Sequence, residues 1–197
     1  MKRILIAAML AAFATTGAYA GPVLTLIPTV ATGFAGGATG WGYDIANPDP
    51  ANFLVLNDSF VTGSLSTGVS GNYIDYIAAN FIVIGPGSDS GPVAFNRSTT
   101  AGVGEFDFKA VVPPNTKVPG TINVDFSLFS QNPNDPNFDP GSFVSSGTVS
   151  AAAEADVVPE PGSGLLVGGS LLLVALAIGA SGSRWNRFLP KRRSQHL

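Results

Sequence analysis

The segment TINVDFSLF (121–129) alternates apolar and polar side chains with a period of two residues. A strand with one buried and one solvated face produces this alternation, because successive side chains point to opposite sides of a sheet. The segment EFDFKAV repeats the pattern, with Phe106, Phe108 and Ala110 on one side and Glu105, Asp107 and Lys109 on the other. We therefore expect a chain built from sheets, in which Glu105 and Asp107 lie on a solvated face.

Further strand candidates are separated by stretches rich in proline and glycine, such as NPDPAN, GPGSDSGP and VPPNTKVPG. Proline removes donors from a β-ladder and glycine permits positive φ, so these stretches are expected to be turns. The candidates are residues 39–45, 53–61, 73–84 (in one piece or two) and 148–156. Residues 21–156 are thus predicted to form a mainly β domain without a long helix, an antiparallel β-sandwich of Ig-like or jelly-roll-like type.

The residue types that are missing exclude several kinds of site. The sequence contains no cysteine, so no disulfide can stabilise the domain, and its stability must come from a hydrophobic core. The only histidine is His196, near the C-terminus. Residues 21–158 therefore cannot form a Ser-His-Asp triad, a Cys-His pair or a His-ligated zinc site from their own side chains. We expect no cofactor.

Charge is segregated along the chain, although the net charge of all 197 residues is only −3. Residues 21–158 carry 12 acidic side chains against 3 basic ones, a net charge of −9, and most of the basic residues lie at the two ends. A body of this charge repels nucleic acid and anionic lipid surfaces. The acidic residues are expected to serve solubility, and nucleic acid is not expected as a partner.

The N-terminus has the three parts of a secretory signal peptide. The chain begins MKR, continues with an apolar run at 4–13 and reaches the small-x-small motif Ala18-Tyr19-Ala20. The apolar run is too short to span a bilayer comfortably. We expect signal peptidase to cleave after Ala20 and to remove residues 1–20, with an uncleaved N-terminal anchor as the alternative.

A second apolar segment lies near the C-terminus. Residues 161–183 carry no charge, and their length is that of a membrane span, so a transmembrane helix is expected at about 163–183. Basic residues follow it directly, and such flanks stay on the cytoplasmic side. These are Arg184, Arg187, Lys191, Arg192 and Arg193. The tail is therefore expected in the cytoplasm and the acidic body on the far side, the topology that a signal peptide also predicts.

The tripeptide Pro159-Glu160-Pro161 precedes a short glycine-rich spacer, this apolar span and the arginine-rich end. The order of these elements in residues 157–197 resembles the PEP-CTERM sorting signal of Gram-negative bacteria. The resemblance implies that a membrane-embedded exosortase recognises and processes the tripeptide, and that the protein is exported in association with extracellular polysaccharide and biofilm. The tail FLPKRRSQHL is longer than the few basic residues usual in the family. A plain membrane anchor, with proline and an acid in the first helical turn, is the alternative.

We therefore expect a non-enzymatic exported protein of the cell surface or extracellular matrix. It would pass through an inner-membrane intermediate, held by the C-terminal helix, before reaching the cell surface, the outer membrane or the matrix. Signal peptidase and exosortase are the expected processing partners, and exopolysaccharide is a further candidate partner. The alternatives are a permanently membrane-anchored carbohydrate- or calcium-binding module and, less favoured, a secreted hydrolase.

Two groups of residues in the body could bind a ligand. The loop NPNDPNFDPG offers oxygen ligands for calcium, although its spacing misses the EF-hand pattern and an ordinary surface loop has the same composition. These ligands are Asn134, Asp135, Asn137 and Asp139. Four aromatic residues could stack on sugar rings, although core packing is favoured because Trp41 and Tyr43 share a face with Ile45. The four are Trp41, Tyr43, Tyr73 and Tyr76.

Two further sequence patterns could support chemistry. The carboxylate pairs of Glu105 with Asp107 and Glu154 with Asp156 could serve glycoside hydrolysis, but exposed carboxylates usually serve solubility. The motifs that begin at Asn57 and Asn96 fit the N-glycosylation pattern and are interpreted as two polar turns.

Overall fold

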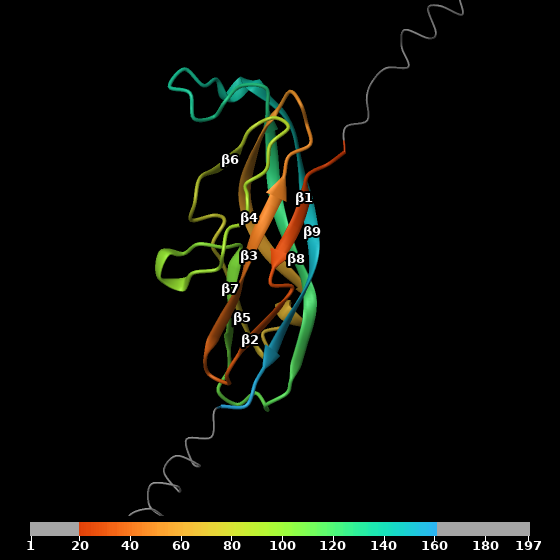
Figure 1. Ribbon diagram of the computed structural model, residues 1–197, viewed down its shortest axis with the longest axis vertical. Coiled ribbons are helices and arrows are strands. Elements are labelled where there is room, and N and C mark those ends of the chain that lie inside the picture. The colour runs from red at the N-terminus through yellow and green to blue at the C-terminus, as the bar shows by residue number, and fades with distance from the viewer. Residues whose placement is uncertain (1–19, 161–197) are drawn as a thin grey trace, which may run out of the picture. The chain divides into compact units, whose positions relative to one another are not determined.

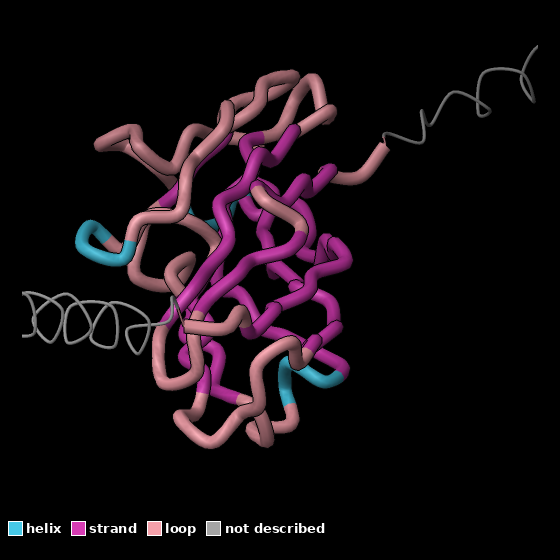
Figure 2. Tube along the Cα trace, turned by 60° about the horizontal axis from the view of Figure 1, so that its bottom comes forward, coloured by secondary structure: helices cyan, strands magenta, loops and turns pink. Residues whose placement is uncertain are grey.

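The computed structural model describes residues 20–160, and about half of this part of the chain lies in β-strands (Figure 1). The strands are β1 (Val23–Ile27), β2 (Val30–Gly33), β3 (Ala38–Ala46), β4 (Phe53–Gly63), β5 (Gly71–Asp75), β6 (Ile82–Ile84), β7 (Gly104–Phe108), β8 (Lys117–Phe129) and β9 (Phe143–Val157). Three short 3-10 helices lie between them, namely η1 (Ser64–Ser66), η2 (Arg97–Thr99) and η3 (Pro140–Ser142) (Figure 2).

The strands form two sheets. One sheet has the order β1-β3-β7-β5, and the other has the order β2-β9-β8-β4-β6. Neighbouring strands run antiparallel except for β2 and β9, which pair in parallel. The expected mainly β chain with antiparallel pairing is confirmed, apart from this one parallel pair.

A single hydrophobic core receives side chains from both sheets. Trp41 and Ile45 of β3, Phe106 of β7 and Ile122 and Val124 of β8 are completely buried. The period of two residues in β8 therefore has the predicted cause, because Ile122 and Val124 pack inward. Burial of each such side chain contributes roughly 1.5–3 kcal/mol, and this core takes the place of disulfides.

The predicted strands match β3 and β4 closely, and the segment 73–84 divides into β5 and β6. The predicted strand EFDFKAV is too long, because β7 ends at Phe108 and Ala110 is exposed in the turn that follows. The strands β8 and β9 begin earlier than expected, at Lys117 and Phe143, and β9 continues one residue past the expected boundary, to Val157. The strands β1 and β2 were not predicted from the sequence.

The segment between β6 and β7 (residues 85–103) packs against β3. Tyr43 and Val93 exchange two backbone hydrogen bonds of 2.9 and 2.8 Å, which continue the sheet beyond the end of β7. Two glycines of β3 allow this approach, because a Cβ atom would lie 2.2 Å from the Phe95 ring at Gly40 and 2.2 Å from the Val93 oxygen at Gly42. The 85–103 segment thus covers part of the sheet face that points away from the core.

The turn NPDPAN is held by buried polar side chains. The Asn47 amide nitrogen, in a residue only 1% exposed, donates to the carbonyl oxygens of Asn52, Ile84 and Gly85 at 2.9, 3.4 and 3.0 Å. Burial alone would raise the pKa of Asp49, but hydrogen bonds from the Asn52 side chain and from backbone amides lower it. The turn between β3 and β4 is therefore fixed against the end of β6.

Within residues 20–160, no helix is both long enough and apolar enough to cross a membrane. The expected transmembrane helix at 163–183 lies outside the described residues, as do the apolar run of the expected signal peptide and the basic tail.

Candidate functional site

Strand β7 brings Glu105 and Asp107 together, since residues two apart on a strand share a face. The two carboxylates point away from the core, on the side opposite to Phe106 and Phe108. The prediction that Glu105 is solvated is wrong, because its residue is only 1% exposed. The reason is the 85–103 segment, which covers this face and brings Arg97 over Glu105.

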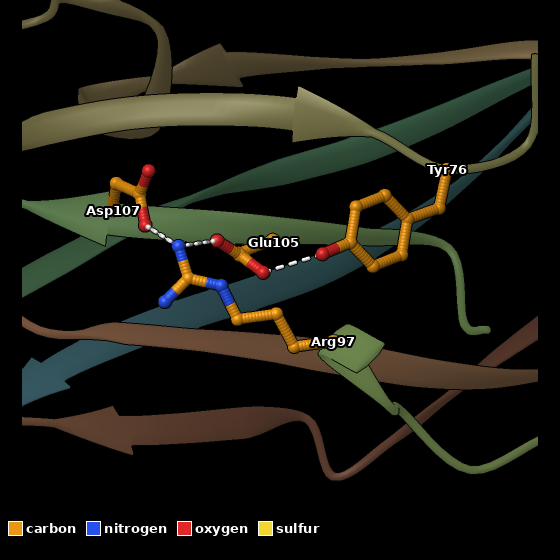
Figure 3. Close-up of polar contacts among 4 residues, drawn as sticks. All are labelled: Tyr76, Arg97, Glu105 and Asp107. Carbon is orange, nitrogen blue, oxygen red and sulfur yellow. Dashed lines mark hydrogen bonds and ion pairs between the residues drawn. The ribbon is translucent and has the colours of Figure 1, made fainter. Parts of the chain in front are cut away.

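Four side chains form a polar cluster at this position (Figure 3). Arg97 Nη2 lies 3.0 Å from Glu105 Oε1 and 3.5 Å from Asp107 Oδ1. On the other side, the Tyr76 hydroxyl donates a hydrogen bond to Glu105 Oε2. The Tyr76 ring also stacks on Phe95, with centroids 6.0 Å apart and an interplanar angle of 13°. We call Tyr76, Arg97, Glu105 and Asp107 the Glu105 cluster.

Burial controls the protonation of this cluster. Removal of Glu105 from water raises the pKa of its carboxyl, and Asp107 raises it further, whereas Tyr76 and Arg97 oppose the shift. Burial and the hydrogen bond to Glu105 raise the pKa of Tyr76 to about 12. The hydroxyl therefore keeps its proton at neutral pH and can act as a donor to Glu105.

The Glu105 cluster is arranged to hold the 85–103 segment in place. A glycosidase needs two carboxyl groups on either side of the bond to be cleaved, with space for a sugar between them. Here Glu105 is covered by Arg97 and Tyr76, and both carboxylates face the same guanidinium. The Glu105–Asp107 pair therefore lacks the arrangement that glycoside hydrolysis requires.

The second carboxylate pair is also engaged by a cation. Lys117 Nζ lies 2.7 Å from Glu154 Oε1 and 3.3 Å from Asp156 Oδ2, across the β8–β9 ladder. This interaction lowers the pKa of Glu154 and raises the pKa of Lys117. All three side chains are reached by solvent, so the ion pairs add little to stability.

The four aromatic residues do not form a surface for stacking on sugars. Trp41 is completely buried, and Tyr43 and Tyr76 are only 4% and 6% exposed. Tyr73 is half-buried and its hydroxyl hydrogen-bonds with Ser59. The hypothesis that these residues bind carbohydrate is wrong for the three buried ones, and the favoured interpretation of Trp41 and Tyr43 as core residues is confirmed.

The oxygens proposed to bind calcium accept hydrogen bonds from their own loop. Asp135 Oδ1 accepts from the Asn137 backbone amide at 2.8 Å, and Asp139 Oδ1 accepts from the Gly141 amide at 2.8 Å, at the start of η3. In the described part of the chain, no group of three or more His, Cys, Asp or Glu side chains is placed to hold a metal ion. Calcium binding by Asp135, Asn137 and Asp139 stays an untested alternative to the favoured interpretation as an ordinary surface loop.

The two glycosylation-type motifs differ in structure. Asn96 is exposed and caps η2, because its side-chain oxygen accepts from the backbone amides of Ser98 and Thr99, as expected for a polar turn. Asn57 was also predicted to lie in a turn, and this is wrong. It lies within β4 at a register shift, and its amide donates to Ser127 Oγ at 3.0 Å.

The two expected processing sites border the β domain directly. Ala20 is exposed and lies three residues before the start of β1. At the other end, the Val158 backbone amide donates to the Gly33 oxygen at 2.8 Å, and the next two residues, Pro159 and Glu160, are exposed and belong to no strand. Ala18, Pro161 and the five basic residues of the tail lie outside the described residues.

Sequence reasoning missed Tyr76 and Arg97 as partners of Glu105. One signal was available, since Arg97 is the only arginine among residues 21–158, where carboxylates greatly outnumber cations. A comparison of the chain with protein-family models and with curated proteins finds no match in either.

Proposed function

We propose that this chain is a non-enzymatic bacterial protein that is exported and then sorted through its C-terminal segment to the cell surface or extracellular matrix. The observation that carries the proposal is the position of the β domain between two exposed junctions. Its first strand starts just after the expected signal-peptidase site, and its last strand ends just before Pro159. Cleavage at either junction leaves the core intact.

The chemistry of the C-terminal junction supports recognition by a membrane protease. Proline cannot donate to a β-ladder and restricts the residue before it, which explains why Pro159 and Glu160 are exposed and belong to no strand. The apolar span at about 163–183 would hold this segment at the outer face of the inner membrane, with Arg184 to Arg193 in the cytoplasm. The resemblance of residues 157–197 to a PEP-CTERM signal makes an exosortase the processing enzyme.

The strand order supports an Ig-like sandwich rather than a jelly roll. In Ig domains, one sheet has the strand order A-B-E-D and the other contains G-F-C. The sheet β1-β3-β7-β5 matches the first order, and β9-β8-β4 matches the second, with β2 and β6 added at the edges. One connection differs from that of Ig domains. Strand β6, which pairs with β4, follows β5 in the chain, whereas the corresponding strand of an Ig domain precedes strand D, the position that β5 occupies here.

Two observations favour a structural or binding role over catalysis. The only histidine lies in the expected cytoplasmic tail, and the best-placed carboxylate of the body, Glu105, is buried under Arg97. The proposed partners are signal peptidase, exosortase and extracellular polysaccharide, and no cofactor is required.

The proposal is tested with the full chain fused after Leu197 to a cytoplasm-active reporter, in hosts with and without an exosortase. We expect reporter activity in both hosts, and separation of the β domain from the reporter only where the enzyme is present. Glu160→Ala should block that separation, whereas the matched variant Asp156→Ala should not. An intact fusion in the exosortase host would instead establish a permanent anchor, and an inactive reporter would overturn the topology.

A further inference from the structure

A polar groove of about 360 Å³ lies across β4, β8 and β9. This volume is within the range of small-molecule sites. Its side-chain lining combines an amide, a carboxylate, hydroxyls and one exposed aromatic ring. These residues are Asn57, Asp125, Ser127, Ser146, Thr148 and Phe143. The half-buried Phe126 and Gly147 complete the lining of this depression, which we call the β8 groove.

Two β-bulges, one in the β4–β8 pairing and one in the β8–β9 pairing, determine where the β8 groove lies. The β4–β8 register shifts between Leu56 and Asp58, which leaves Asn57 as the extra residue. The β8–β9 register shifts between Leu128 and Phe129, which leaves Val144 as the extra residue on β9. Bulges re-aim side chains and are common beside binding sites. Here they bring the Asn57 amide and the Phe143 ring to the same depression.

Cross-strand hydrogen bonds fix the polar side chains of the groove. The Asn57 amide donates to Ser127 Oγ at 3.0 Å, and the Thr148 hydroxyl donates to Asp125 Oδ1. Within residues 20–160, these contacts leave Asn57 Oδ1 and Asp125 Oδ2 as unused acceptors. Preorganised groups of this kind lose little conformational entropy when a ligand binds.

The Phe143 ring is held at one end of the groove and remains open to solvent. Its residue is 52% exposed, and its ring meets Phe129 edge to face at 5.9 Å and 74°. Phe129 in turn contacts Phe138 at 5.3 Å. A supported aromatic ring offers a flat apolar surface, which suits the C–H-rich face of a sugar ring.

Charge narrows the class of ligand. Asp125 is the only ionisable side chain in the lining, and no lysine or arginine lines the groove. Asp58 faces Asp125 across the β4–β8 ladder and makes this surface more negative. The net charge of −9 over residues 21–158 also makes the potential at the groove more negative. An anionic ligand is therefore disfavoured, whereas neutral hydroxyl groups match the amide, hydroxyl and carboxylate groups.

From these observations we propose that the β8 groove binds a segment of neutral polysaccharide, with one sugar ring on Phe143 and its hydroxyls on Asn57 and Asp125. A polymer fits better than a single sugar, because the polar ladder continues past the groove through the 2.7 Å hydrogen bond from Ser150 Oγ to Asn123 Oδ1. This inference names a ligand for the proposed matrix protein. It rests on the proposed function only for where the polysaccharide comes from. The binding itself is a property of the purified protein.

The test is affinity electrophoresis of the full chain in a non-ionic detergent, in gels that contain a single polysaccharide. The neutral probes are xyloglucan, galactomannan and mixed-linkage β-glucan, and the polyanion is polygalacturonate. We expect retardation by at least one neutral probe and none by the polyanion. Phe143→Ala should weaken the binding roughly three- to tenfold, and Asn57→Ala should weaken it as well. The matched control is Phe81→Ala, which removes another exposed ring, 68% exposed and outside the groove.

Each other outcome overturns part of the inference. Absence of retardation by all three neutral probes contradicts binding, and equal loss in Phe143→Ala and Phe81→Ala contradicts the location. Equal retardation by polygalacturonate contradicts the ligand class. Circular dichroism of each variant shows whether its fold is kept, and Asn57→Ser gives a second, milder variant if Asn57→Ala unfolds. A protein that is processed as proposed but binds none of the probes would refute only the groove.

Discussion

Replacement of Arg97 by alanine tests whether the Glu105 cluster holds the 85–103 segment. The two partners differ sharply in burial, since the Arg97 side chain is 63% exposed and the Glu105 side chain is 1% exposed. Arg97→Ala therefore leaves a charge buried without its cation, whereas Glu105→Gln removes the buried charge and leaves a solvated arginine. The two variants should have unequal effects, although they break the same ion pair.

The burial of each side chain determines how much free energy of unfolding its replacement should cost. Loss of one partner from a fully buried ion pair costs about 3–5 kcal/mol, and the exposure of Arg97 reduces this, so we expect a loss of about 2 kcal/mol. Glu105→Gln should change the free energy of unfolding by less than about 1 kcal/mol, because the glutamine oxygen can still accept from Tyr76. The double variant should recover more than half of the loss caused by Arg97→Ala alone.

The assay is urea unfolding of the full chain in a mild non-ionic detergent, followed by fluorescence of the buried Trp41, with Trp185 replaced by phenylalanine in every variant. Lys117→Ala is the matched control, because it breaks an exposed ion pair and should change stability only slightly. A loss in Glu105→Gln as large as that in Arg97→Ala, or no recovery in the double variant, would show that the asymmetry of burial is not the cause.

Three further predictions concern the same domain. Asn47→Ala should lower the free energy of unfolding by about 2 kcal/mol in the urea assay, because it leaves buried carbonyl oxygens without a donor, and a loss below about 0.5 kcal/mol would contradict this. Gly42→Ala should cost about 3 kcal/mol, because its Cβ atom would lie 2.2 Å from the Val93 oxygen and disrupt two hydrogen bonds. Gly21→Ala meets nothing within 4 Å and should have no effect, so similar results for the two glycines would count against that account. Burial raises the folded-state pKa of Glu105, so its contribution to stability is fully present below about pH 4 and is lost as the pH rises through the raised pKa. The stability of the protein relative to Glu105→Gln should therefore fall as the pH rises above about 4, and the opposite trend would show that the ion pair outweighs burial.

The periodic part of the fold could be predicted from the sequence. Alternation identified the segments that became β7 and β8, because one face of each packs into the core. The flanking proline- and glycine-rich turns marked the segments that became β3 and β4. The strands β1 and β2 were missed because Pro28 divides their run into pieces of five and four residues, too short for the pattern to be distinctive.

The candidate sites were harder to predict, since they depend on contacts between distant segments. A period of two residues assigns Glu105 to a face of β7 but does not show that another segment covers that face. The cover depends on Gly40 and Gly42, which precede Phe95 and Val93 by more than 50 residues in the chain and leave space for them. The role of Asn57 depends in turn on a bulge, because one extra residue changes the direction of the side chain.

The most direct test of the proposed export and sorting is the intact mass of the mature protein recovered from its native host. We predict a chain that begins at Gly21 and ends within Pro159-Glu160-Pro161, with the β domain complete between them. A mass that includes Met1, or one that extends to Leu197, would contradict processing at the corresponding junction.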